Sequence, residues 1–360
     1  MRTFLGIDGG GTKTDFLLID ESGRVLASHQ AGSAYYLETG IDALQRMLVT
    51  GIQATLQQAA VPVAQVSFAF IGLPAHGEDG ALLPRLDGIA AGVLPVERHR
   101  CGNDMVCGWA GALAGRDGIN IVAGTGSIAY GEFECRCARA GGWGELFSDE
   151  GSAYWIAREA LTLFSRMSDG RASKAALHAL IRERFQLRAD LDLCAAVYGP
   201  PPLARSEVAA LAPLVAQAAR AGDPAALRLF ELAAQELAAI VHAVRDHLDV
   251  SPQTSLPVSH SGGMFRLEGL LTPLLEAALK SGDRRYEFVA PRLPPSAGAA
   301  LYAAKLAGAA LTPEFVAGLA RSFDGRERVS DARSGISCSR SLSGCRERSP
   351  YFWEAGAYPW

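Results

Sequence analysis

The first twenty residues constrain the fold of this chain more than any other segment. Two apolar segments, Thr3–Asp8 and Asp15–Asp20, have the pattern of strands and flank a run of three glycines that Thr12 and Lys13 follow. Glycine adopts positive φ at little cost and lets a backbone approach a ligand closely. A turn that points several N–H groups at one place can bind an anion. The segment therefore predicts a hairpin whose turn is either a plain tight turn or a phosphate site, and we favour the phosphate site.

Asp8 lies at the mouth of this turn. Its carboxylate would repel a phosphate unless a cation lay between the two groups. Mg²⁺ is usually held by one or two carboxylates together with substrate phosphates. We therefore expect Asp8 to hold Mg²⁺, through water, beside a bound phosphate.

Length and charge narrow the class of protein. A chain of 360 residues fits about two domains, and a hydrophobic content of 49% is ample for a core. The net charge of −4 gives no basic footprint for nucleic acid or an anionic membrane. The sequence has neither a signal-peptide pattern at its start nor an apolar run long enough to span a bilayer. The seven scattered cysteines fit reduced thiols, so we expect a cytoplasmic protein.

Alternation of strands and helices in the first part indicates an α/β domain with a partly parallel sheet. A continuous apolar run at Val66–Leu73 fits a strand buried on both faces. The other elements expected here are a strand at Val25–Gln30, helices at 38–60 and 79–93, a short strand ending at Cys101–Asp104, and a helix at Met105–Ala114.

A similar opening recurs after Arg116–Gly118, where a strand, a glycine turn and a returning strand follow one another. This repeat predicts a duplicated architecture with domains at 1–116 and 117–322. The expected elements are strands at Ile119–Ala123 and Ile128–Phe133, helices over most of 150–250 with one starting at Asp223-Pro224, strands at Leu256–His260 and Tyr286–Ala290, and helices reaching Lys280 and spanning Ala297–Ala309.

Two segments carry no predicted function. Beyond Ser322 the apolar periodicity stops, so we expect 323–360 to be a disordered tail. Cys135 and Cys137 form a C-x-C pair without a second pair at metal-ligand spacing. We interpret them as alternating side chains of one strand.

The sequence contains four polar or glycine-rich turns, at Asp8–Thr14, Asn103-Asp104, Gly124–Ser127 and Ser261–Met264. Between the last two lies the segment Gly141–Ile156, GGWGELFSDEGSAYWI. With these motifs the chain resembles the actin–hexokinase–Hsp70 superfamily. More closely, it is similar to the BadF/BadG/BcrA/BcrD ATPase family in its N-acetylglucosamine/glucosamine kinase branch, over residues 3 to about 310. The resemblance implies an α/β fold of two actin/ribonuclease-H-like domains around a central cleft, each a mixed sheet with flanking helices. It also implies that the last helix can return to the N-terminal domain.

The resemblance implies ATP and Mg²⁺ as cofactors and phosphorylation of an amino sugar at its 6-hydroxyl. Two glycine turns would donate N–H groups to the ATP phosphates, and a third turn would approach the adenine and ribose. Lys13 would add a positive charge or remain solvated. The expected ATP-binding residues are Gly9, Gly10, Gly11, Thr12, Lys13, Gly124, Thr125, Gly126, Ser127, Gly262, Gly263 and Met264.

Asp104 is the candidate general base. It follows a strand at the end of an α/β sheet where ligands bind, and a carboxylate there can accept the proton of a sugar hydroxyl. The alternative is that Asp104 only caps the following helix. The resemblance favours the base, because the catalytic Asp of the family lies at this point.

The sugar-binding residues implied by the resemblance are Asn103, Asp104, Gly142, Trp143 and Asp149. An aromatic face can pack on a sugar ring while a carboxylate accepts from its hydroxyls. From the residues alone, Trp143 could equally be core and Asp149 a helix cap near Gly151.

Two departures leave the identity of the sugar open. Kinases of this branch often carry Asn where this chain has Ala34 in Gly32–Tyr35, and some carry Asn where it has Ile128. Ser33 or Tyr35 could replace the lost amide contact. N-acetylglucosamine, glucosamine and N-acetylmuramic acid all remain candidates.

Two other functions remain as alternatives to a sugar kinase. One is an ATPase activator of a CoA-ester reductase or dehydratase, which would need an iron–sulfur cluster held by cysteine near the second turn. The other is a non-catalytic, nucleotide-dependent sugar sensor. The expected partner is a small-molecule amino sugar, without nucleic acid or membrane, and a homodimer is a possible assembly.

Overall fold

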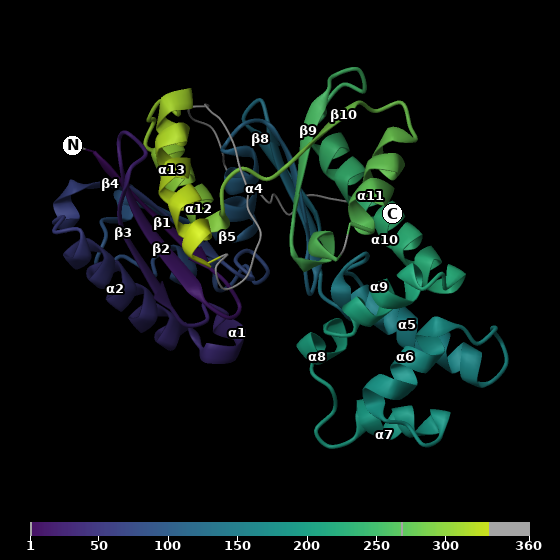
Figure 1. Cartoon of the computed structure of the whole chain (residues 1–360). Helices are drawn as coiled ribbons and strands as arrows, with labels where there is room; N and C mark the ends of the chain where they lie inside the picture. The colour runs from purple at the N-terminus through teal and green to yellow at the C-terminus, as the bar shows by residue number, and fades with distance from the viewer. Residues whose placement is uncertain (1, 268, 331–360) are drawn as a thin grey trace.

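Two five-stranded mixed sheets form the centres of the molecule (Figure 1), as seen in a computed structural model that describes residues 2–267 and 269–330. The first sheet has the order β3-β2-β1-β4-β5 and the second the order β10-β9-β6-β7-β8. The strands are β1 (Thr3–Gly9), β2 (Thr14–Asp20), β3 (Val25–Ala31), β4 (Val66–Leu73), β5 (His99–Asn103), β6 (Gly118–Ala123), β7 (Ser127–Phe133), β8 (Arg136–Gly141), β9 (Leu256–Ser261) and β10 (Tyr286–Val289).

The two sheets repeat one topology. In each sheet the first three strands form an antiparallel meander, and the fourth and fifth strands add in parallel beside the first. The same strand order and directions in both halves confirm the duplication predicted from the two strand–turn–strand openings.

Helices cover both faces of the first sheet, and alternate residues of its strands point to opposite faces. Leu5 and Ile7 pack with α2 (Ile41–Gln58), whereas Phe4 packs with the helices on the other face. The expected helix at 38–60 is interrupted at Gly40, where φ is +81°, and α1 (Tyr36–Thr39) precedes α2. Short 3₁₀ turns η1 (Val63–Gln65) and η2 (Val96–Arg98) precede β4 and β5.

The helix predicted at 79–93 is wrong for most of its length. Only α3 (Leu83–Asp87) is helical, and turns occupy the rest. Gly80, Gly88 and Gly92 divide this segment, and glycine in a helix interior costs about 1 kcal/mol relative to alanine.

Helices α4 (Met105–Leu113) and α12 (Pro295–Leu306) lie between the two sheets (Figure 1). Their backbones touch, because a Cβ at Gly298 would lie 2.1 Å from the Cys107 carbonyl oxygen. A buried ion pair adds to this junction: Lys305 Nζ of α12 lies 2.7 Å from Glu132 Oε2 of β7. The helix expected at Ala297–Ala309 therefore packs closely against α4.

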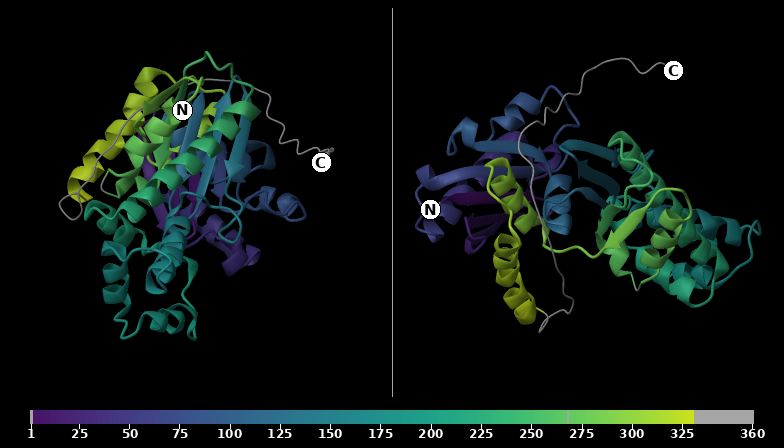
Figure 2. Two further views of the ribbon diagram at one scale, coloured as in Figure 1. Left: turned by 90° about the vertical axis from the view of Figure 1, so that its right-hand side faces the viewer. Right: turned by 90° about the horizontal axis from the view of Figure 1, so that it is seen from above.

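Helices cover the outer face of the second sheet and extend beyond it (Figure 2). The longest, α10 (Pro224–His247), starts as predicted, with the Asp223 carboxylate accepting from Ala225 N and Ala226 N. The others are α5 (Ala153–Ser168), α6 (Ala176–Phe185), η3 (Asp190–Asp192), α7 (Leu193–Tyr198), α8 (Arg205–Ala209), α9 (Ala212–Arg220), η4 (Gly263–Arg266) and α11 (Leu271–Lys280).

The last helix, α13 (Pro313–Ser330), returns to the first domain, as the resemblance implied. A Cβ at Gly23, in the β2–β3 turn, would lie 2.0 Å from the Phe315 carbonyl oxygen. Because α13 continues to Ser330, the tail expected from 323 starts too early. The remainder of that predicted tail, 331–360, lies outside the described residues. Among the helices of the described ranges, none is long and apolar enough to cross a membrane.

Candidate active site

The carboxyl ends of β1, β4 and β5 bring the two predicted acidic residues together. Asp8 on β1 pairs in register with Gly72 on β4, and the next pair, Leu73 with Asn103, places Asp104 directly after β5. A Cβ at Gly72 would lie 3.2 Å from Asp104 Cα. A glycine at position 72 therefore gives the strand end the space that Asp104 needs.

Burial makes both carboxyls weak acids. Burial, followed by the charges of Asp104 and Asp15, raises the pKa of Asp8 to about 7. Burial raises the pKa of Asp104 to about 6, while Arg139 of the second domain acts in the opposite direction. An acid with a pKa near neutrality can accept and release a proton at the operating pH, as a general base must.

Asp104 occupies the N-cap position of α4 within the described structure. Its side chain makes no capping hydrogen bond there, and the Asn103 side chain takes that place, with Oδ1 accepting from Met105 N at 3.1 Å. The position of Asp104 therefore fits a cap, whereas the capping hydrogen bond of its side chain is missing. Asn103 Nδ2 also donates to the His76 carbonyl at 3.3 Å, so both ends of the amide already have partners.

Cys107 is a neighbour that the sequence did not reveal. Its buried thiol donates to the Ile7 carbonyl oxygen at 3.8 Å, and burial followed by the charges of Asp8 and Asp104 raises its pKa. A Cβ at Gly72 would lie 2.3 Å from its Sγ. The thiol is therefore protonated and lies at the strand end that carries Asp8, and a lone cysteine in a small-residue helix gave no signal of this.

The first glycine turn is open. Gly10 N donates to the Lys13 carbonyl, and Ala34 N donates to the Gly10 carbonyl. Thr12 and Lys13 are exposed, and Lys13 Nζ lies 2.5 Å from an Asp15 carboxylate oxygen. A Cβ at Gly11 would meet nothing within 4 Å. Ala34, the departure noted in the sequence, is buried and supports this turn through its backbone.

The second glycine turn is held by the residues before and in α5. Ala153 N donates to the Gly124 carbonyl and Tyr154 N to the Thr125 carbonyl. Ser127 is buried, and its hydroxyl donates to the Glu150 carbonyl at 2.7 Å. The Ser127 side chain is thus used inside the protein, whereas Thr125 is exposed.

The third turn lies against the second. A Cβ at Gly262, where φ is +102°, would lie 2.3 Å from the Ala123 carbonyl oxygen and 2.9 Å from Gly124 N. Gly262 is therefore required for this contact between β9 and the second turn. Gly263 is half-buried beside it, whereas the Met264 side chain is buried in the core of the second domain, so only its backbone is available to a ligand.

The segment after β8 presents an aromatic side chain to solvent. The Trp143 side chain is 66% exposed, and its neighbours Leu146 and Phe147 are also exposed. The interpretation of Trp143 as a core residue is therefore wrong. Gly142 has a φ of +70°, and a Cβ there would lie 2.7 Å from Ile128 Cδ1. The departure at Ile128 therefore packs directly beneath the predicted sugar segment.

Asp149 has a role that neither sequence interpretation included. It does not cap α5 in the described structure, where Ser152 is the cap. Its buried carboxylate accepts from Ser127 N at 3.3 Å through Oδ1 and pairs through Oδ2 with Arg205 of α8. Arg205 was missed because it stands 56 residues away in a segment that matched no motif.

The C-x-C pair does not lie on one strand as expected. Cys135 is exposed in the β7–β8 turn with a φ of +66°, and only Cys137 is in β8. Two positive-φ residues, Glu134 and Cys135, form this turn. Both cysteines lie at the far end of β7 from the second glycine turn.

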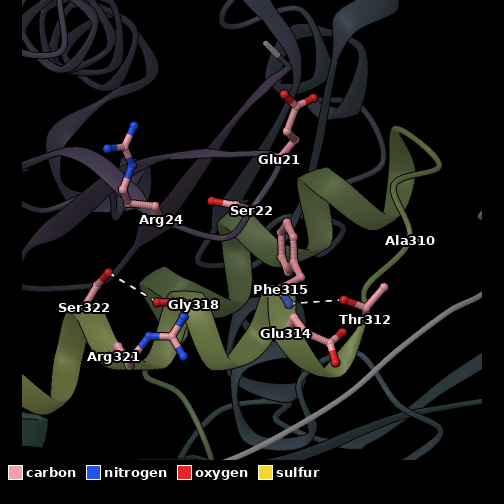
Figure 3. A pocket seen from close by; sticks show the side chains of 10 residues that line it. All are labelled: Glu21, Ser22, Arg24, Ala310, Thr312, Glu314, Phe315, Gly318, Arg321 and Ser322. Carbon is pink, nitrogen blue, oxygen red and sulfur yellow. Dashed lines mark hydrogen bonds between the residues drawn. The ribbon is translucent and has the colours of Figure 1, made fainter.

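A cavity of about 680 Å³ lies elsewhere, between the β2–β3 turn and α13 (Figure 3). Glu21 and Arg24 line one side, and Phe315 and Arg321 line the other. This turn is at the opposite end of β2 from the first glycine turn. The cavity is therefore separate from the Asp8 and Asp104 site.

The fold has two domains that share one mixed-sheet topology, each with a glycine turn between its first two strands. The sequence profile of the BadF/BadG/BcrA/BcrD ATPase family matches residues 5–303, and the chain belongs to this family. The predicted family and fold class are thereby confirmed.

Several relatives share most of their length with this chain. An N-acetyl-D-glucosamine kinase of Dictyostelium discoideum is 27% identical over 83% of this chain and 97% of its own. An N-acetylmuramic acid/N-acetylglucosamine kinase of Clostridium acetobutylicum is 30% identical over 74% of this chain and 86% of its own. A solved structure from Chromobacterium violaceum, described as a candidate N-acetylglucosamine kinase, superposes with a TM-score of 0.65 at 28% identity, covering 84% of this chain and 99% of that one.

Proposed function

We propose that this chain is an ATP-dependent amino-sugar kinase that phosphorylates the 6-hydroxyl of N-acetylglucosamine or glucosamine. The observation that carries the proposal is the Asp104 carboxylate, which lies at a strand end beside Asp8 and makes no side-chain capping hydrogen bond to α4. The names of the similar proteins support the substrate class.

In the proposed reaction, Asp104 accepts the proton of the sugar hydroxyl as that oxygen attacks the γ-phosphorus of ATP. The new O–P bond forms while the bond to the β-phosphate oxygen breaks, and ADP leaves. Phosphoryl transfer depends mostly on positioning and charge stabilisation. The two glycine turns would supply backbone N–H donors, and Gly262 and Gly263 would let the chain approach the adenosine.

Mg²⁺ fits the donors around Asp8. The described residues contain no group of three or more His, Cys, Asp or Glu side chains that could hold a metal alone. Asp8 offers oxygen ligands in a site with excess negative charge, which suits a hard divalent cation that shares its ligands with phosphates. When bound, Mg²⁺ would neutralise phosphate charge, and Asp8 would be its protein ligand, through water.

Trp143 and Asp149 would bind the sugar from the second domain. An exposed indole face suits the apolar face of a sugar ring. Asn103 and Gly142 would contribute through their position beside Asp104 and Trp143. The proposed domains keep the sequence boundary near 116, with α12 and α13 returning to the first domain.

The direct test is ADP release with a panel of sugars and a control without sugar. We expect turnover with N-acetylglucosamine or glucosamine, and N-acetylmuramic acid is included because one relative carries its name. Glucose serves as the control without an amino group. ATP hydrolysis at the same rate with and without every sugar would contradict the proposal.

A further inference from the structure

Arg205 lies against the second glycine turn. A Cβ built on Gly126 would lie 2.7 Å from Arg205 Nη2 and 2.7 Å from Asp149 Oδ2. The guanidinium pairs with Asp149 through Nη2, and its Nε lies 3.1 Å from Glu145 Oε2. A cation is therefore held directly beside the turn that is expected to bind ATP phosphate.

We propose that Arg205 contacts the γ-phosphate of bound ATP. To do so, its guanidinium breaks its ion pair with Asp149, and Asp149 Oδ2 then becomes free to accept from a hydroxyl of the sugar. The inference rests on the proposed kinase function and adds to it a residue that no motif identified. It also explains how a buried carboxylate that is fully paired in the present structure could take part in sugar binding.

The charges around the site favour this exchange. Asp8 and Asp104 lie at strand ends of the first sheet, and Glu145 and Asp149 both pair with Arg205 beside the second turn. Lys13 of the first turn is paired with Asp15. A nucleoside triphosphate adds further negative charge, and its terminal phosphate carries more charge than a carboxylate. A planar guanidinium binds phosphate oxygens in pairs, which a lysine cannot do.

Arg205 has the freedom to move. Its side chain is 39% exposed and its second partner, Glu145, is 38% exposed, whereas the Asp149 side chain is only 3% exposed. Asp149 stays anchored by Ser127 N when Arg205 leaves. The moving part of the cluster is therefore the arginine, and the fixed part is the carboxylate.

The exchange links the two substrates. While Arg205 holds Asp149, one carboxylate oxygen is unavailable to the sugar. When the γ-phosphate takes the guanidinium, that oxygen becomes an acceptor. ATP, but not ADP, should therefore increase the affinity for sugar, because only ATP carries the phosphate that Arg205 contacts.

The test compares nucleotide binding by wild type and Arg205→Met, using the non-hydrolysable adenylyl imidodiphosphate and ADP. We expect the variant to bind the triphosphate analogue about 10-fold more weakly and ADP within about 2-fold of wild type. Its kcat should fall by about 100-fold or more, the size seen when one donor to a developing anion is lost. The gain in sugar affinity caused by the analogue should disappear.

Two further variants separate this role from a purely structural one. Arg158→Met is the matched control, because Arg158 is 41% exposed and paired with an adjacent carboxylate, Glu159. It should behave like wild type in every measurement. Glu145→Gln weakens the resting hold on Arg205, so it should leave triphosphate binding unchanged or strengthen it.

Equal loss of triphosphate and ADP binding in Arg205→Met, or full kcat in that variant, would overturn the inference. So would a loss in Glu145→Gln that parallels the loss in Arg205→Met, since both would then act by disrupting the loop. Failure of the kinase proposal is distinct: wild type would turn over no amino sugar, while the comparison of triphosphate with ADP would still report on Arg205.

Discussion

The two glycine turns occupy equivalent places in two copies of one topology, yet their surroundings differ. The first turn, Gly9–Thr14, is open, with its lysine paired to a neighbour and two weakly acidic carboxyls behind it. The second turn, Gly124–Ser127, is hydrogen-bonded to the start of α5 and lies against an arginine–aspartate pair. The two domains therefore share one strand topology, but different side chains surround their glycine turns.

This difference suggests a division of labour. In the proposed function, the first half carries the groups that would hold the metal and accept the proton. The second half fixes the geometry of the phosphate turn and joins it to the predicted sugar segment through Asp149. Substitutions in the two halves should therefore impair the protein in different ways.

Asp104→Asn should have the largest effect, because it removes the proton acceptor of the first half and keeps the size of the side chain. We expect kcat to fall by about 10²- to 10⁴-fold, the usual contribution of a general base, with ATP binding retained. In wild type, kcat should also decline as pH falls below about 6, where Asp104 becomes protonated. Steady-state kinetics across pH check both, and near-normal turnover by the variant would remove Asp104 as the base.

Gly126→Ala should be the next most harmful change, because it tests how tightly the second turn is packed. The new methyl would lie 2.7 Å from both Arg205 Nη2 and Asp149 Oδ2, so the pair must shift. Misplacement of about 1 Å can cost about 100-fold in rate.

Gly11→Ala is the counterpart in the open first turn, where the methyl would meet nothing within 4 Å. It should cost less than about 10-fold in kcat/KM. Equal losses in the two variants would show that the turns do not differ as described.

Trp143→Ala should change sugar binding more than chemistry. The side chain is 66% exposed, so its removal leaves the core intact. We expect the sugar KM to rise about 10-fold, as for the loss of one aromatic stacking contact, with kcat and the melting temperature nearly unchanged. An unaltered sugar KM would exclude Trp143 from the sugar site.

Asp8→Asn should give the smallest effect, on stability in the absence of metal and nucleotide. Because the folded-state pKa of Asp8 is raised to about 7, the folded protein loses stability as pH rises from the ordinary value of 3.8 through 7. The neutral variant avoids this loss, and we expect a gain on the order of 1 kcal/mol at pH 8. Urea unfolding at pH 8 and at pH 5 measures it.

Asp20→Asn is the matched control for the direction of this stability change. Although burial acts against it, hydrogen bonds from Ser22 and Arg24 lower the pKa of Asp20, so its ionised form stabilises the fold. This variant should be less stable than wild type at neutral pH, and the difference should shrink as pH falls below 4. A loss of stability at pH 8 in both variants would contradict the assignment for Asp8.

Local patterns predicted the strands and the family well. The apolar run at Val66–Leu73 is β4 to the residue, and Asp223-Pro224 starts α10, because burial on two faces and capping chemistry are written in adjacent residues. The segment 79–93 failed because its apolar spacing resembles a helix while its glycines favour turns. The predicted start of the tail at 323 was wrong because α13 continues beyond the last apolar residue of its stripe.

The candidate site was predicted in its motifs but not in its connections. Asp8, Asp104 and the glycine turns stand out because each is an irregular residue at a strand end. Arg205 and Cys107 do not, because their importance comes from interactions across 56 and 99 residues of sequence, with Asp149 and Asp8. No local pattern encodes that the Asn103 side chain would accept the hydrogen bond from Met105 N at the start of α4.

The central claim is phosphoryl transfer to an amino sugar with Asp104 as the base. Its most direct test is to follow wild type and Asp104→Asn by ³¹P NMR with Mg²⁺, ATP and either N-acetylglucosamine or glucosamine. Wild type should form one sugar 6-phosphate for each ADP with one of these sugars, and the variant should form almost none while still binding ATP. Release of ADP and inorganic phosphate without any sugar phosphate would contradict the claim.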